Sequence, residues 1–160
     1  MTETNGNQPP GNLPPRLSEI VEDFQWAEGR EKLEILLQYA ENMPPLPESL
    51  QKKVSDWDQV EECMTPVAVY AEVQDGKMRF YFDVPPESPT VRGYAAILAE
   101  GLKDATPEEV LQVPGDFYLH MGLQQVLTAQ RLNGITAILA HIKQLAVQAL
   151  RQEDQTGTAS

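Results

Sequence analysis

The first third of the chain repeats its apolar residues at the spacing of two helices. The inward face of the first predicted helix carries Leu17, Ile20, Val21 and Phe24. Pro14 and Pro15 mark its start, because proline is favoured in the first turn of a helix. Trp26 and Trp57 are expected to fill the core or an interface.

A second helix is predicted from about Arg30. Its inward positions are Leu33, Leu36, Leu37 and Ala40. Its outward positions are Glu31, Lys32 and Glu34. The proline-rich run 43–47 ends this helix, because proline lacks an amide proton and clashes with the preceding turn. Residues 48–54 are expected to form a short helix beyond it.

The middle of the chain changes to the two-residue period of β-strands. Apolar residues alternate with other residues from Val67 to Val73, and again from Met78 to Phe82. Asp75-Gly76 lies between the two runs, and glycine tolerates the positive φ of a tight hairpin turn. These runs predict a β-hairpin, and residues 57–63 are expected to add a third antiparallel strand.

The second half of the chain returns to helical patterns. A helix is predicted from Pro89 to about Leu102, and Thr106 and Glu109 fit a capping box before a short helix that ends at Gln112. Residues 114–123 are expected to form a turn and a loop, and a last helix is predicted over 128–151. Helices, a hairpin and further helices predict an α+β fold, with a small antiparallel sheet packed against several helices.

Composition sets the expected limits of the domain. Residues 1–15 are mostly Asn, Gly, Gln and Pro, which bury too little surface to offset the entropy of ordering, so a disordered leader is predicted. This stretch has neither the basic start nor the apolar core of a targeting signal. Residues 152–160 are polar and small and are expected to form a flexible tail. One packed domain is therefore predicted over 16–151.

The net charge argues against nucleic acid as a partner, and the length of the apolar stretches argues against a membrane span. Lys and Arg total 12 and Asp and Glu total 24, which gives a net charge of −12. A nucleic-acid backbone repels such a surface, and no stretch clusters its cations. The best uncharged apolar stretch near the C-terminus, 132–142, has 11 residues, which is too short to span a membrane.

Cys63 is the main candidate for chemistry. It is the only cysteine, so the chain has no internal disulfide, and with two histidines it offers no tetrahedral zinc set. It lies in a connection just before the hairpin, where side chains are often exposed, although free cysteines are also among the most buried residue types. Glu61 and Glu62 precede it, and like charge disfavours the thiolate. The residues therefore favour a thiol that receives a group over one that is already activated for attack.

Arg131 is the second candidate. It is the only Lys or Arg between Lys103 and Lys143, and near the start of a helix it opposes the helix dipole. Either a functional role or a salt bridge to a nearby carboxylate explains it. His120 and His141 are expected to be structural. The carboxylates show no metal-loop spacing, and the chain has no phosphate-binding glycine loop.

Several short motifs stand in a fixed order from 17 to 150. They are Met43-Pro44-Pro45-Leu46-Pro47, Cys63 before a valine-rich strand, Thr90-Val91-Arg92-Gly93 with Ala96-Ile97-Leu98, Thr106-Pro107-Glu108-Glu109-Val110, and Gly122-Leu123 followed by Leu127-Thr128-Ala129-Gln130-Arg131-Leu132-Asn133-Gly134-Ile135. In this order the set resembles the SufE family, the sulfur-acceptor partners of cysteine desulfurases.

The resemblance implies a SufE/IscU-like fold and a function. Cys63 would take the outer sulfur from a persulfide on a SufS-like cysteine desulfurase, stimulate its turnover and pass the sulfur to a SufBCD-like scaffold for iron–sulfur cluster assembly. The chain would hold no cofactor, because the sulfur is carried as a persulfide on Cys63 and the pyridoxal phosphate belongs to the desulfurase. Arg131 would contact the partner or position the cysteine loop, and Arg92 matches the basic residue of the Val-(Lys/Arg)-Gly helix.

One motif departs from the family pattern, and other functions stay open. The family commonly has Gly-Cys-x-Ser-x-Val-Trp, whereas Glu62 precedes the cysteine here and Pro66 follows it. The alternatives are a docking adaptor in which Cys63 is structural, or a thiol hydrolase or peroxidase that uses Cys63 with His120. An iron–sulfur cluster scaffold is disfavoured, because a cluster usually needs three or four thiolate or imidazole ligands and this chain has one cysteine. The lone thiol and the absence of a signal peptide predict a cytoplasmic location, and the resemblance implies an accessory protein of a cysteine desulfurase rather than an independent enzyme.

Overall fold

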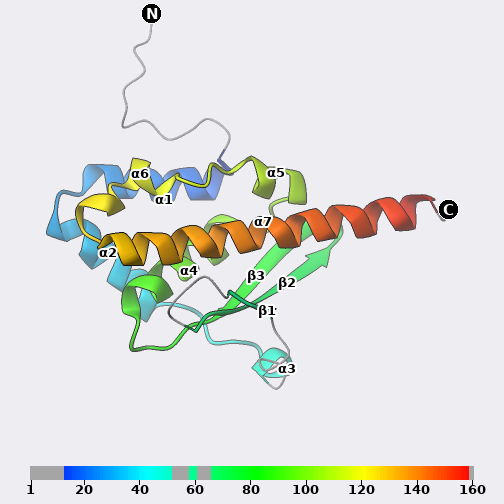
Figure 1. Cartoon of the computed structure of the whole chain (residues 1–160), viewed down its shortest axis with the longest axis horizontal. Helices are drawn as coiled ribbons and strands as arrows, with labels where there is room; N and C mark the ends of the chain where they lie inside the picture. Colours follow the sequence, from blue (N-terminus) through cyan, green and yellow to red (C-terminus); the bar gives the residue numbers. More distant parts are fainter. Residues whose placement is uncertain (1–12, 52–57, 61–65, 159–160) are drawn as a thin grey trace, which may run out of the picture.

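The computed structural model describes residues 13–51, 58–60 and 66–158. Its elements are α1 (Pro15–Trp26), α2 (Arg30–Glu41), α3 (Glu48–Gln51), β1 (Asp58–Gln59), β2 (Ala68–Gln74), β3 (Lys77–Asp83), α4 (Pro89–Gly101), α5 (Pro107–Gln112), α6 (Tyr118–Met121), the 3₁₀ helix η2 (Leu123–Gln125) and α7 (Ala129–Thr158). A three-stranded antiparallel sheet of order β1-β2-β3 packs against these helices, and α7 runs along the length of the molecule (Figure 1). The predicted α+β fold is confirmed.

The two N-terminal helices form where the apolar spacing places them. Leu17, Ile20, Val21 and Phe24 on α1 are fully buried. Leu13 is also buried in the core, although it lies within residues 1–15, for which a disordered leader is predicted. Trp26 is 85% exposed, so it does not fill the core. Of the short helix predicted over 48–54, residues 48–51 form α3, and the remainder lies outside the described residues.

The hairpin is confirmed in its strands and its turn. Gln74 pairs with Lys77 across the two-residue turn Asp75-Gly76, and both turn residues have positive φ, 55° and 76°. Alternate side chains of β3 face the core, because successive residues of a strand point to opposite faces. Of the predicted third strand over 57–63, Asp58–Gln59 pair with β2, and residues 57 and 61–63 lie outside the described residues.

The helices after the sheet follow the predicted order with two differences. The Thr106 amide donates to Glu109 Oε1 at 2.8 Å and the Glu109 amide donates to Thr106 Oγ1 at 3.2 Å, which is the predicted capping box. Where a turn and a loop were expected, α6 and η2 form. The last helix continues past Arg151 to Thr158. The division into leader, domain and tail stays a prediction.

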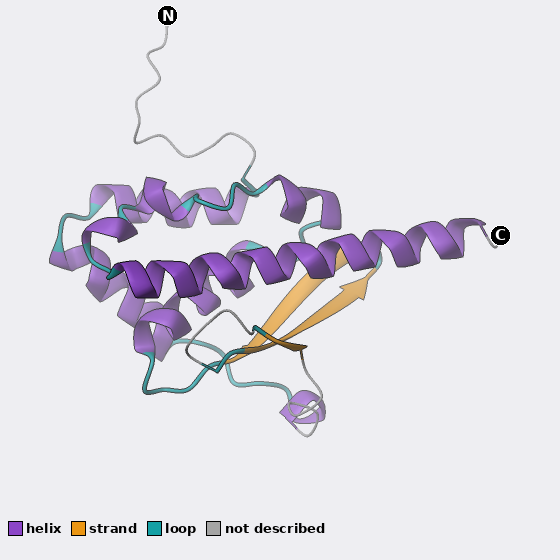
Figure 2. Cartoon of the chain, in the orientation of Figure 1, coloured by secondary structure: helices purple, strands orange, loops and turns teal. Residues whose placement is uncertain are grey.

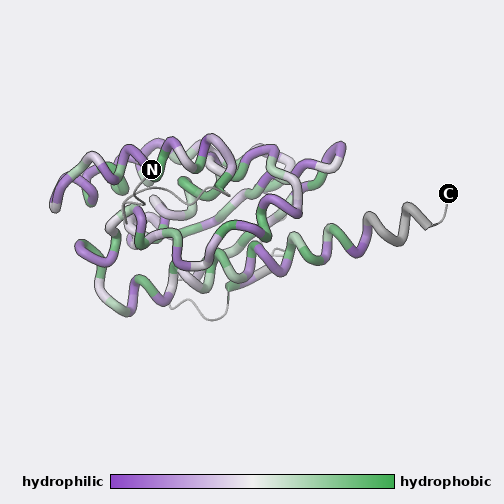
Figure 3. Tube along the Cα trace, turned by 90° about the horizontal axis from the view of Figure 1, so that it is seen from above, coloured by the Kyte–Doolittle hydropathy of each residue, from purple (hydrophilic) through white to green (hydrophobic). Residues whose placement is uncertain are grey.

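Helix α7 is amphipathic. Its apolar positions Ile135, Ile138, Leu139 and Ile142 are fully buried, as the spacing predicts. Apolar and polar positions alternate along the helix that leads to the C-terminus in the view from above (Figure 3). None of the described helices combines the length and the apolar character needed to cross a bilayer.

Helix α4 lies at the centre of the fold because Gly93 lets it approach α2 closely. A Cβ atom at Gly93 would lie 2.2 Å from the carbonyl oxygen of Leu36. The neighbouring Arg92 uses this approach: its Nε donates to Ala40 O at 3.2 Å and its Nη1 donates to Val84 O at 2.8 Å. One side chain of α4 thus joins the end of α2 to the end of β3.

Lys32 corrects the prediction that it faces solvent. Its side chain is buried, and its ammonium donates to Phe24 O at 2.6 Å and to Ala27 O at 2.7 Å. These carbonyls belong to the end of α1, where the last carbonyl groups lack partners within the helix and attract a cation. Gly122 makes room, because a Cβ atom there would lie 2.7 Å from Lys32 Cε. The helical periodicity of α2 does not reveal that one of its residues caps another helix.

We expect Gly93→Ala to lower the free energy of unfolding by about 2 kcal/mol, because the added methyl meets a backbone carbonyl that cannot rotate away. Urea titration followed by circular dichroism measures the change. Gly115→Ala is the matched control, because a Cβ atom there has nothing within 4 Å. Equal stability of the two variants would contradict the close approach of α2 and α4.

We expect Lys32→Met to lower the free energy of unfolding by about 2 kcal/mol, because two buried carbonyls lose their charged donor. The exposed Lys77→Met serves as the control for removal of a positive charge. Thermal unfolding of both variants tests this. If Lys32→Met unfolds at the same temperature as the wild type, the capping of α1 by Lys32 does not contribute to stability.

Candidate functional site

The stretch that carries Cys63 is held at both of its ends. Residues 61–65, and Cys63 with them, lie outside the described residues. On either side, Val60 and Val67 are buried, and the Val60 amide donates to Val67 O at 3.0 Å. The two ends of the stretch therefore lie side by side.

These two ends lie at one particular end of the sheet. Gln59 pairs with Ala68 at the start of β2, and Ala68 pairs with Asp83 at the end of β3. Figure 2 shows the start of β2 and the end of β3 together, at the end of the sheet from which the loop to α4 departs. Arg92 anchors that loop through Val84 O. The ends of the Cys63 stretch therefore lie at the end of the sheet from which the chain continues into the first turn of α4.

Arg131 reaches the first turn of α4 from α7. Its Nη1 donates to Thr90 Oγ1 at 2.8 Å, and Thr90 is 9% exposed. Its own amide donates to Thr128 Oγ1 at 3.3 Å, which satisfies one free N–H group at the start of α7. Arg131 forms no ion pair with any carboxylate that the structure describes, so among these residues its partner is a hydroxyl group and not the carboxylate of the salt-bridge alternative.

The hydrogen bonds connect Arg131 to the sheet end through α4. Thr90 holds Arg131, and Arg92, two residues later, holds the end of β3. Thr90 and Arg92 belong to one of the sequence motifs, but the sequence assigned no role to Thr90. The sequence shows only that Arg131 is isolated among cations, because the packing of α4 against α7 is what brings Thr90 to it.

The histidines lie in other surroundings. His120 is half-buried in α6, which packs against α1 rather than against the strands (Figure 1). His141 is half-buried in α7. Within the described ranges, no group of three His, Asp or Glu side chains is arranged to hold a metal ion. The geometry therefore offers His120 no described contact with the ends of the Cys63 stretch.

Comparison with known proteins places these features in a family. Residues 18–146 match the family model described as SufE, Fe-S metabolism associated domain. An uncharacterized SufE-like protein of Mycobacterium tuberculosis is 40% identical over 146 residues, which cover 91% of this chain and 98% of that protein. The cysteine desulfuration protein SufE of Plasmodium vivax is 26% identical, over 90% of this chain and 58% of its own length.

A solved structure shows the same fold. The solution structure of a hypothetical protein from Thermus thermophilus is 39% identical and superposes with a TM-score of 0.76, covering 87% of this chain and 98% of that chain. The match to the family model spans most of the residues that form the core, from α1 into the buried part of α7. This chain belongs to the SufE family, whose domain is associated with iron–sulfur metabolism.

Proposed function

We propose that Cys63 accepts the outer sulfur of a persulfide on a cysteine desulfurase and carries it as a persulfide of its own. The observation that carries this proposal is a single cysteine, in a SufE-family chain, in a stretch whose two ends are joined by the Val60–Val67 hydrogen bond. A short connection anchored in this way gives a docked donor a defined place to meet.

The transfer is a thiol–persulfide exchange that needs no external oxidant. The Cys63 thiolate attacks the outer sulfur of the donor persulfide, a new S–S bond forms and the donor S–S bond breaks. The donor cysteine leaves as a thiolate, and the proton that Cys63 loses can return to it. Glu61 and Glu62 disfavour the free thiolate, so the donor site is expected to supply the base after docking.

Arg131 is proposed to contact the partner or to position the cysteine stretch. The guanidinium group has five N–H donors, and Nη1 donates a hydrogen bond to the Thr90 hydroxyl. Arg131 is otherwise exposed, so its remaining donors can meet a carboxylate on a docked protein. Thr90 sets the direction of the guanidinium plane.

The later steps are proposed from the same chemistry. The Cys63 persulfide passes its outer sulfur to a SufBCD-like scaffold, and the desulfurase, of the SufS type, holds the pyridoxal phosphate. The chain itself then needs no cofactor. It acts as an accessory protein in the cytoplasm, where a lone thiol stays reduced.

We expect Cys63→Ser to abolish the stimulation of a cysteine desulfurase, because serine cannot form a persulfide. Mass spectrometry after incubation with the desulfurase and free cysteine should show one added sulfur on the wild-type peptide that contains Cys63. In the control variant Cys63→Ser/Gln124→Cys, the single thiol stands at a different, exposed position. This variant should not restore stimulation. Full stimulation by Cys63→Ser would instead identify the protein as a docking adaptor.

We expect Arg131→Ala to reduce desulfurase stimulation about tenfold and Thr90→Val to reduce it less, because the second variant keeps the cation but releases its anchor. The double variant should be no worse than Arg131→Ala, since both changes act on one group. Arg151→Ala, an exposed change further along α7, is the control. The measurement is the concentration of this protein needed for half-maximal stimulation. Additive effects of the two changes would show that Thr90 does not act through Arg131.

A further inference from the structure

Strand β3 has an outer edge that the hairpin turn defines. In a two-residue hairpin the residues that flank the turn, here Gln74 and Lys77, exchange hydrogen bonds, and every second residue of β3 does the same with β2. The backbone groups of Met78, Phe80 and Phe82 therefore point away from β2. Met78 bears this out, because its amide donates to Ala105 O at 2.8 Å and its carbonyl accepts from the Asp104 amide at 2.9 Å.

The edge is covered at Met78 and open beyond it. Among the residues that the structure describes, none forms a backbone hydrogen bond to Phe80 or Phe82 on this side. Both side chains are buried in the core, and this burial sets the direction in which the amide and carbonyl groups of the strand point. An edge of this kind is a template for an additional strand.

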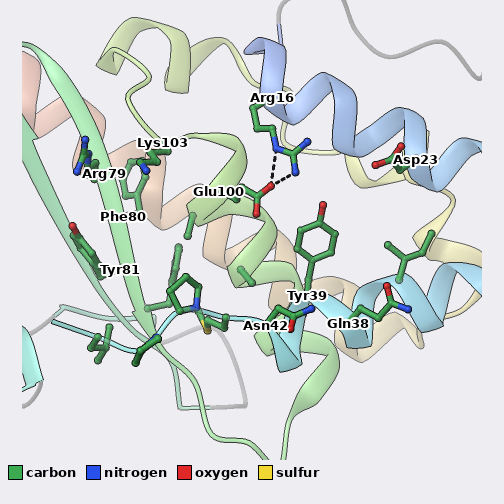
Figure 4. A pocket seen from close by; sticks show the side chains of 18 residues that line it. Arg16, Asp23, Gln38, Tyr39, Asn42, Arg79, Phe80, Tyr81, Glu100 and Lys103 are labelled. Carbon is green, nitrogen blue, oxygen red and sulfur yellow. Dashed lines mark hydrogen bonds and ion pairs between the residues drawn. The ribbon is translucent and has the colours of Figure 1, made fainter.

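A groove of about 850 Å³ runs beside this open edge. Its floor is the small-residue face of α4 at Ala96 and Ala99, and its far wall comes from α1 and α2, where Tyr39 is half-buried. Figure 4 shows the edge of β3 on one side, Tyr39 on the other, and the ion pair between Arg16 and Glu100 between them. The run 43–46 lines one end, so this proline-rich motif of the sequence has a place in the groove.

The other end of the groove is cationic in a chain with a net charge of −12. Arg79 hydrogen-bonds Asp104 at 3.0 Å, and this bond, with the charges of Arg79, Lys103 and Lys77, lowers the pKa of that carboxyl. Three cations thus surround one carboxylate, and Lys77 and Lys103 form no ion pair with any described residue. The local excess of positive charge favours an incoming carboxylate.

The carboxylates that line the groove do not cancel this excess. Glu100 is held by Arg16, and Asp23 lies on α1, on the wall opposite β3 (Figure 4). The two ends of the groove therefore differ in chemistry. One end offers apolar and aromatic surface around Tyr39 and Met43, and the other offers Arg79 and Lys103.

We propose that this groove binds an extended, acidic segment of a partner protein, which adds as a fourth strand to the edge of β3 at Phe80 and Phe82. Side chains of an added strand alternate, so one set would face α4 and Tyr39 and the other would lie beside Arg79. The open edge, residues 79–83, accommodates about five residues at roughly 3.3 Å each.

This docking site is separate from the proposed sulfur-transfer site and does not depend on it. The groove borders β3, whereas the Cys63 stretch follows β1 at the opposite edge of the sheet. A partner held along β3 thus leaves the β1 side accessible to a second protein. Such an arrangement allows one protein to stay bound while another meets the cysteine stretch.

The test uses the full chain labelled with ¹⁵N and the peptide acetyl-Val-Glu-Val-Asp-Val-amide as the probe. Saturable shifts of the Phe80 and Phe82 amide resonances, and slower hydrogen exchange of both amides, are the expected result. The peptide acetyl-Val-Lys-Val-Lys-Val-amide should bind at least about tenfold more weakly, because it brings like charges together. No saturation at millimolar acidic peptide, or equal binding of both peptides, overturns the proposal.

Two variants separate this groove from other surfaces. Lys103→Glu should weaken the acidic peptide about tenfold, and Arg151→Glu, the same charge change far along α7, should leave binding unchanged. Ala99→Arg fills the floor of the groove and should abolish binding while the amide spectrum elsewhere stays native. If sedimentation of the protein without peptide shows a dimer that Ala99→Arg dissociates, the edge belongs to a second copy of the chain and the proposal is wrong.

Discussion

The close approach of α4 to α2 at Gly93 determines where the residues of both proposed sites lie. Because no side chain separates Gly93 from the Leu36 carbonyl, Arg92 can reach both the end of α2 and the end of β3. The same placement of α4 brings Thr90 within reach of the guanidinium of Arg131. On the other side it makes Ala96 and Ala99 the floor of the groove beside β3. One helix thus organises both surfaces.

Several cations bind oxygen atoms inside the fold, although the chain is strongly acidic overall. Lys32 is buried where it caps the end of α1, and Arg92 and Arg131 bind uncharged oxygens rather than carboxylates. These three cations fix the relations between elements, because a charged donor holds a backbone or hydroxyl oxygen more strongly than a neutral one. The exposed Lys103 instead lines one end of a groove, and the exposed Lys77 lies near it beside Asp104. The positive charges are thus divided between those that join elements of the fold and those left available for the proposed partner.

Membership of the SufE family and the geometry support each other at the cysteine stretch. The family concerns iron–sulfur metabolism, and the chain has one cysteine, in a connection whose ends are anchored beside the short β1–β2 pairing. The sheet is small, yet its two edges face different surroundings. The β1 edge leads to Cys63, and the β3 edge faces a groove lined by helices.

The amino-acid sequence by itself determined the longer helices and the hairpin, because apolar periodicity, proline positions, the Asp75-Gly76 turn and the capping box are local signals. It did not reveal α6 and η2, or the extension of α7 past Arg151. It also singled out Cys63 and Arg131, because each is isolated among residues of its kind. It placed Lys32 in solvent, since periodicity cannot show that a lysine will meet the end of another helix. The contact of Arg131 with Thr90 and the groove at β3 were decided by tertiary structure alone, because they join residues far apart in the chain, and their geometry arises only when α4 packs against α2 and α7.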